Sequence, residues 1–134
     1  MDPKLINWLA VFVAALSAFM VGGMWYSPKV FGTAWMADTG LSQDEIRKGN
    51  KARAFGMTAV FSLIMSANLA AFLAAPTTNL QWGATAGFLA GIWTFSAIAI
   101  HSLFELKSWR LIFINGGYSV VSLTLMGAIL GAWR

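Results

Sequence analysis

Residues Ala54–Phe104 read AFGMTAVFSLIMSANLAAFLAAPTTNLQWGATAGFLAGIWTFSAIAIHSLF and contain no Asp, Glu, Lys or Arg. A membrane-spanning helix needs about 20 apolar residues, each adding roughly 1.5 Å of length. The stretch is long enough for two such helices, and the sequence PTTNLQ at 76–81 has the proline and polar residues of a turn. We therefore expect two spans here, at 54–75 and 82–103.

Two more uncharged runs flank this stretch, Leu5–Pro28 before it and Leu111–Trp133 after it. Each has the length of one span, which we place at 5–26 and 111–133. The first run is longer than the roughly 7–15 apolar residues of a cleaved signal peptide, so we expect it to be retained. The chain is predicted to be all-α, with residues 1–134 forming one integral membrane four-helix bundle.

The composition indicates that lipid is the solvent for most of the chain. Of the 134 residues, 58% are hydrophobic and 10% are charged, whereas soluble domains carry about 25% charged residues. The chain has no cysteine, which excludes disulfides, thiolate metal sites and cysteine nucleophiles. The net charge of +4 would suggest nucleic acid for a soluble protein, but here the basic residues flank apolar runs. No nucleic-acid partner is therefore expected.

The basic residues predict an orientation in the membrane. Lys and Arg concentrate in short cytoplasmic loops, and seven of the nine lie in loop 27–53 or in the turn that follows residue 103. We expect these segments in the cytoplasm and both termini outside. Loop 27–53 is also expected to attract anionic lipid headgroups, at about 1 kcal/mol for each basic residue. The seven residues are Lys29, Arg47, Lys48, Lys51, Arg53, Lys107 and Arg110.

The sequence WYSPKVFGTAWM, residues 25–36, follows the first span directly. Trp and Tyr favour the membrane interface, so the first two aromatics are interpreted as anchors. Ser27 suits the N-cap of a new helix that Gly40 would end. We expect this helix to be short, amphipathic and flat in the cytoplasmic interface, with two further aromatics on one face. A binding role is the alternative. The predicted anchors are Trp25, Tyr26, Pro28, Phe31 and Trp35.

The order W-Y-S-P, F-G, W-M and G, at residues 25–28, 31–32, 35–36 and 40, resembles a family of small bacterial membrane proteins, domain-of-unknown-function family 1761. The opening NWLAV at 7–11 is similar to that family too. The resemblance implies a multi-pass protein of the bacterial cytoplasmic membrane, of about this length. It implies no activity, cofactor or site residue.

Glycines predict where the helices pack. In lipid, helices associate where small side chains let the backbones approach closely. Span 82–103 repeats glycine at four-residue spacing, and span 111–133 carries a matching pair. The sequence leaves open whether these faces pack within one chain or between the subunits of a homo-oligomer. The residues predicted for helix packing are Gly83, Gly87, Gly91, Gly127 and Gly131.

The spans contain few groups with chemistry. No ionisable side chain lies near the middle of a span, which weighs against proton-coupled transport and against hydrolysis within the membrane. His101 and Glu105 stand one helical turn apart, so their side chains are predicted to hydrogen-bond. They are interpreted either as a pH-sensitive site or as an interfacial pair with a basic neighbour. Asn68 and Asn115 are expected to hydrogen-bond across helices, because an unpaired amide is costly in lipid.

Three functions are compatible with these features. The first is a non-enzymatic membrane protein that self-associates, or binds a partner, through its small-residue helix faces. The second is a channel or facilitator for a small solute, with a weakly polar pore between subunits. The third, an enzyme acting through His101 and Glu105, has the least support, and we predict no catalytic residue, cofactor or metal site. The predicted pore residues are Thr58, Ser62, Ser66, Asn115 and Ser119.

Overall fold

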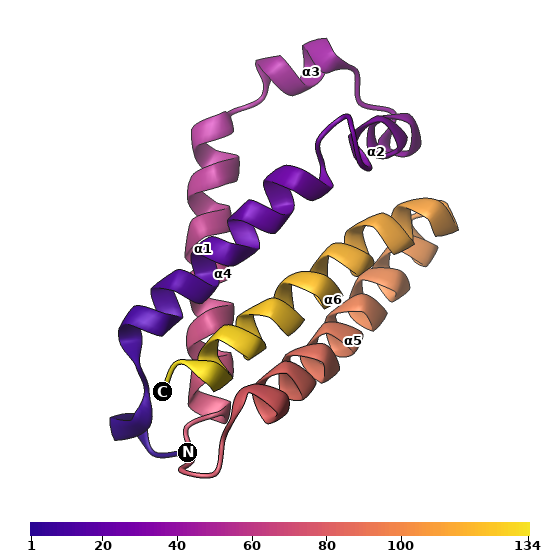
Figure 1. Cartoon of the computed structure of the whole chain (residues 1–134). Coiled ribbons are helices and arrows are strands. Elements are labelled where there is room, and N and C mark those ends of the chain that lie inside the picture. The colour runs from indigo at the N-terminus through magenta and orange to yellow at the C-terminus, as the bar shows by residue number, and fades with distance from the viewer.

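The computed structural model describes residues 1–134 and contains only helices and their connections (Figure 1). The helices are η1 (Pro3–Leu5), α1 (Trp8–Trp25), α2 (Gly32–Thr39), α3 (Gln43–Lys48), α4 (Lys51–Phe72), α5 (Leu80–Phe104) and α6 (Trp109–Ala132). Four of them, α1, α4, α5 and α6, are long and apolar enough to cross a membrane. The predicted all-α fold with four membrane-compatible helices is confirmed.

Each long helix begins after a side chain that caps its N-terminus. Asn7, Asn50, Asn79 and Ser108 each accept a hydrogen bond from the backbone N–H three residues further on. Such a cap satisfies one of the N–H groups that the first helical turn leaves unpaired. Because of these caps, α4, α5 and α6 begin two or three residues before the bounds expected from the uncharged runs.

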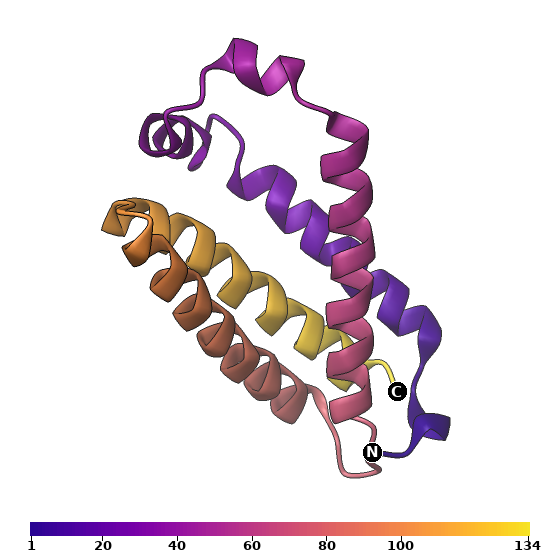
Figure 2. The same cartoon turned by 180° about the vertical axis from the view of Figure 1, so that it is seen from behind.

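The four long helices pack unequally (Figures 1 and 2). α5 and α6 lie side by side as an antiparallel hairpin, and α1 lies along α6, whereas α4 crosses α1 steeply. The termini and the turn at 73–79 lie at one end of the molecule. α2, α3 and the turn between α5 and α6 lie at the other end. The two segments that hold most of the basic residues are therefore at the same end.

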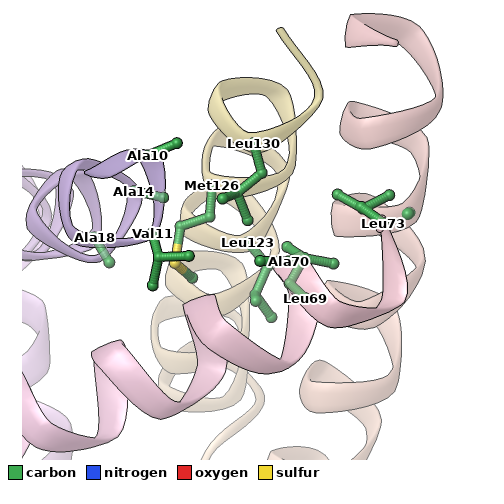
Figure 3. Close-up of a cluster of buried hydrophobic side chains, with 11 residues drawn as sticks. Ala10, Val11, Ala14, Ala18, Leu69, Ala70, Leu73, Leu123, Met126 and Leu130 are labelled. Atoms are coloured by element: carbon green, nitrogen blue, oxygen red, sulfur yellow. The ribbon is translucent and has the colours of Figure 1, made fainter. Parts of the chain in front are cut away.

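The main apolar core lies where α1, α4 and α6 meet (Figure 3). Alanines on one face of α1 allow the other helices to approach it closely, and larger side chains such as Met126 fill the remaining space. The core consists of Ala10, Val11, Ala14, Ala18, Leu69, Ala70, Leu73, Ala86, Leu123, Met126 and Leu130.

The first half of α4 lies outside this core. Every residue from Lys51 to Thr58 is exposed, and the first buried side chain of the helix is that of Ser62. This half diverges from α1 in both views (Figures 1 and 2). The bundle is thus less compact than the sequence suggests, because α4 crosses α1 instead of running along it.

Candidate functional site

The glycines of α5 and α6 bring the two backbones into contact. A Cβ atom added to Gly87 would overlap the backbone carbonyl of Leu123, and backbone cannot move aside as a flexible side chain can. The equivalent atoms on the other glycines of this face would also meet backbone. The face is therefore occupied within the chain and is not free to bind a second molecule. Its members are Gly83, Gly87, Gly91, Gly127 and Gly131.

Two aromatic residues fasten the end of α1 to α6. The indole Nε1 of Trp25 donates a hydrogen bond to the carbonyl of Ile114 at 2.8 Å. The hydroxyl of Tyr26 donates to Oδ1 of Asn115, also at 2.8 Å. Both rings are half-buried. The sequence indicates only that these residues suit a membrane surface, and the structure adds that their polar atoms hold two distant helices together.

A third hydrogen bond strengthens the same contact from the side of α6. The Tyr118 hydroxyl donates to the carbonyl of Ala18 at 3.0 Å, and the Tyr118 ring packs edge-on against Tyr26 at 5.6 Å. A Cβ added to Gly22 would lie 3.4 Å from the Tyr118 ring, at ordinary contact distance, so α1 and Tyr118 pack closely here. We call Trp25, Tyr26, Phe31, Trp35, Asn115 and Tyr118 the aromatic junction.

The segment between α1 and α2 is a tight turn. The sequence predicts Ser27 as the cap of a helix starting at Pro28, but α2 begins at Gly32. The Ser27 hydroxyl instead donates to the carbonyl of Met24 at 2.7 Å, and the Ser27 carbonyl accepts from the N–H of Gly32 at 2.9 Å. A Cβ on Gly32 would overlap the carbonyl of Tyr26, so this turn requires glycine. The prediction for Ser27 is wrong because its hydroxyl closes the preceding helix.

Aromatic rings cover this turn. Phe31 packs on Trp25 with ring centroids 4.7 Å apart, and Trp35 packs edge-on against Tyr26 at 6.1 Å. Phe31 and Trp35 thus each contact a different ring at the end of α1. α2 ends at Gly40, whose φ of 73° is left-handed, and the prediction of a glycine stop is confirmed.

An ion pair ties α2 to the start of α6. The guanidinium of Arg110 donates to both carboxylate oxygens of Asp38, at 2.7 and 2.6 Å. These hydrogen bonds hold the pKa of the Asp38 carboxyl below its usual value. The pair lies at the surface, where a salt bridge contributes little to stability. Its geometric role is to fix the position of α2 against the hairpin.

His101 and Glu105 do not form the predicted side-chain pair. Both are exposed at the end of α5, and the one hydrogen bond that joins them runs from the backbone N–H of Glu105 to the backbone carbonyl of His101. Arg110, a candidate partner for this pair, is bound to Asp38. The prediction fails because residues one turn apart are close enough to pair only if their rotamers converge.

Four of the five polar residues predicted to line a pore lie between the helices of one chain, whereas the fifth, Thr58, is exposed and donates to its own helix. Ser66 is fully buried and donates to the carbonyl of Val11 on α1 at 2.8 Å. Ser62 and Ser119 are also buried, and Asn115 is bound by Tyr26. Buried side chains of this kind cannot line a pore between subunits. The pore prediction is wrong for these residues because α4 is rotated so that Ser66 faces α1 and not a second subunit.

A groove of about 690 Å³ separates the second half of α4 from α5. Its walls are almost wholly apolar, and Phe72 and Trp82 close one end with ring centroids 6.1 Å apart. The polar members of its lining are Asn68 and Thr94. We call this the α4–α5 groove. Its main lining residues are Ile64, Asn68, Phe72, Trp82, Ala90 and Trp93.

Asn68 does not hydrogen-bond across helices, contrary to the prediction. Its Nδ2 donates to the carbonyl of Ile64, one turn back on the same helix, at 2.8 Å. The side chain is exposed in the α4–α5 groove. Sequence reasoning identified the amide as costly in lipid but missed the groove, since no local pattern reveals how far apart two spans lie.

A family model described as "Protein of unknown function (DUF1761)" matches residues 9–131. The chain belongs to this family. Neither the comparison with curated proteins nor the comparison with solved structures finds a match. The family assignment supplies no activity.

The DUF1761 match spans both features described above. It begins in the first turn of α1 and ends at Gly131, the last glycine of the α5–α6 contact. In this DUF1761 protein the residues of the aromatic junction and of the glycine contact already pack against other parts of the same chain. The α4–α5 groove is the feature that is open to another molecule, and it is the candidate site.

Proposed function

We propose that this DUF1761 protein is a non-enzymatic membrane protein that binds a transmembrane helix in the α4–α5 groove. The observation that carries the proposal is the groove itself, an apolar hollow of about 690 Å³ between two membrane-compatible helices. An occupant of such a hollow must be largely apolar and must come from within the membrane. A hydrophobic helix satisfies both conditions.

The floor of the groove suits close helix packing. Ala90, Thr94 and Ala97 recur along α5 at spacings of about one turn and line the hollow. Small side chains of this kind let another backbone approach. The glycine face of α5 is occupied by α6, so this alanine face is the small-residue surface that supports partner binding.

The channel interpretation receives no support from the positions of its predicted pore residues. Ser62, Ser66 and Ser119 are buried within the chain. The enzyme interpretation depends on His101 and Glu105, whose side chains are exposed and not hydrogen-bonded to each other. We therefore favour assembly over transport or catalysis.

The proposed setting is the bacterial cytoplasmic membrane, with the end that carries α2 and α3 in the cytoplasm and both termini outside. The distribution of Lys and Arg supports this orientation. In this orientation the basic segment around Arg47–Arg53 would lie at the inner surface, where it attracts anionic headgroups.

Site-specific crosslinking tests the proposal, and the chain is suited to it because it has no cysteine. A benzophenone label is attached at Ile64→Cys in the groove or at Phe12→Cys on α1. The native side chains are comparably exposed, at 48% and 59%. After irradiation in native membranes, we expect crosslinks to a polypeptide from the groove position and mainly lipid adducts from the control.

A second variant checks that the groove is the docking surface. Ala97 is exposed and lines the groove, so Ala97→Phe narrows it without entering the core. We expect this change to remove the polypeptide crosslink from position 64. Lipid adducts alone at both positions, or a polypeptide crosslink that survives Ala97→Phe unchanged, would overturn the proposal.

A further inference from the structure

The amide of Asn68 has hydrogen-bonding capacity that the chain does not use. A primary amide offers two N–H donors and a carbonyl acceptor. In Asn68 one N–H is bound to the Ile64 carbonyl, and no other hydrogen bond of the side chain is formed. The second N–H and Oδ1 therefore face an almost wholly apolar groove within a membrane-compatible helix. Such unpaired polar atoms are costly in hydrocarbon.

This amide selects among the apolar occupants of the groove. A lipid acyl chain matches the apolar walls but carries no donor or acceptor, so it would leave the amide unpaired. A helix that places a polar side chain opposite Asn68 would satisfy it, and polar side chains do hydrogen-bond across helices in membranes. The partner must therefore carry both a donor and an acceptor at that depth.

α4 presents an exposed stripe over nearly its whole length. The stripe residues follow spacings of 4, 3, 4 and 4, which places them on one helical face. A continuous face of this kind matches another long helix better than a small molecule, and such spacing is typical of helices that pack at a shallow angle. We call this face the α4 stripe. It consists of Met57, Phe61, Ile64, Asn68 and Phe72.

We propose that the helix in the groove is α4 of a second copy of this chain, and that the two Asn68 amides pair across a twofold axis. This inference rests on the proposed function. In a twofold interface each residue meets the same surface on the other copy. The free N–H of each Asn68 then donates to Oδ1 of the other. The two reciprocal bonds use the donor and the acceptor that the single chain leaves open.

The position of the amide also fixes the register of the dimer. A single buried asparagine in a helix–helix interface favours the alignment in which it meets its equivalent. Ile64 and Phe72, one turn to either side, then lie near the axis as well. Single cysteines at these positions are accordingly expected to form disulfide-linked dimers, whereas Phe12→Cys on α1 is not.

Fluorescence energy transfer in vesicles tests the amide pair. Purified full-length chains carry donor or acceptor dyes at Gln43→Cys, an exposed position in α3. They are mixed in phosphatidylcholine vesicles at increasing dilution. We expect Asn68→Leu to weaken dimerisation about tenfold, and Asn68→Gln, which keeps the amide, to restore part of it.

Thr58→Val is the matched control. Thr58 lies on the same helix, is exposed, and donates to its own helix at Ala54, as Asn68 does at Ile64. We expect this variant to dimerise like the unmodified chain. An equal loss in Thr58→Val, or full dimerisation of Asn68→Leu, would overturn the amide pair.

The two proposals fail in different ways. If the unmodified chain stays monomeric at every dilution while position 64 still crosslinks to a polypeptide in native membranes, the second copy is wrong and helix binding stands. If position 64 crosslinks only to lipid, helix binding itself is wrong. If Ala97→Phe abolishes dimerisation and Asn68→Leu does not, a second copy binds without the amide pair.

Discussion

The α5–α6 hairpin and α4 are both long apolar helical segments, yet they are held in opposite ways. In the hairpin, glycines bring the backbone of the first half of α5 against the backbone of the second half of α6. α4 meets α1 and α6 with its second half only, and its first half is exposed. Composition does not distinguish them, because both are uncharged over some twenty residues.

The difference shows that the same residue type has opposite consequences in the two regions. A Cβ on Gly87 would overlap backbone, while a Cβ on Gly56 of α4 would meet nothing within 4 Å. Glycine is a packing requirement in the first case and a conformational cost in the second. The hairpin is thus the fixed part of the molecule, and α4 is the part with surface left for a partner.

One added methyl group in each region tests the contrast between the hairpin and α4. We expect Gly87→Ala to destabilise the protein by about 3 kcal/mol, because the added carbon must displace the backbone of α6. Gly56→Ala should instead stabilise it by up to about 1 kcal/mol, through helix propensity alone. Thermal unfolding of the two variants in one detergent measures both. Equal effects of the two variants would contradict the close backbone contact between Gly87 and Leu123.

The attachment of α4 to α1 depends on a hydrogen bond from Ser66 to Val11. Removing it with Ser66→Ala should cost about 1 kcal/mol, a typical value for such bonds. The Thr58 hydroxyl bonds only within α4, so Thr58→Val should change the free energy of unfolding by only a few tenths of a kcal/mol. Unfolding in mild detergent distinguishes them. Similar losses would show that α4 is held by apolar contact alone.

The turn of the hairpin contains a strained leucine. Leu106 has a φ of 60° and an exposed fraction of 91%, in a left-handed conformation that favours glycine at a helix end. Leu106→Gly should therefore stabilise the protein by about 1 kcal/mol. The reverse change, Gly40→Leu at the end of α2 with φ of 73°, should destabilise it by a similar amount. If both changes have the same sign, strain is not the cause.

The smallest expected effect concerns the link between the hairpin and the loop that leads to α4. The folded-state pKa of Asp38 is lowered by Arg110, so the stabilising effect of this pair is present above the ordinary pKa of 3.8. It is lost as the pH falls through the lowered value. The protection of the α2 amides, measured as their exchange rate relative to the intrinsic rate at the same pH, should then fall at low pH. Asp38→Asn should show reduced protection at every pH, and the same pH-dependent loss of protection in that variant would contradict the assignment.

Several elements followed from local patterns. The glycine stop of α2 followed from Gly40 alone. The asparagine and serine caps before α4, α5 and α6 are equally local, but bounds drawn from the uncharged runs placed these helix starts two or three residues too late. The aromatic junction was not predictable in this way. Trp25 and Ile114 stand 89 positions apart, and no periodicity in either segment records that they meet. The pair Gly116-Gly117 beside Tyr118 was the available signal, since a Cβ on Gly117 would lie 3.1 Å from the Trp25 ring.

The sequence by itself determined that the chain has four membrane-compatible helices. Burying backbone in lipid requires helical hydrogen bonding, and the uncharged runs are long enough to provide it. Only the tertiary structure decided which small-residue face is buried against another helix of the chain and which stays exposed. That choice depends on how backbones at distant positions fit together, as Gly87 fits Leu123, and on a helix rotation that buries Ser66 while leaving Asn68 in an open groove.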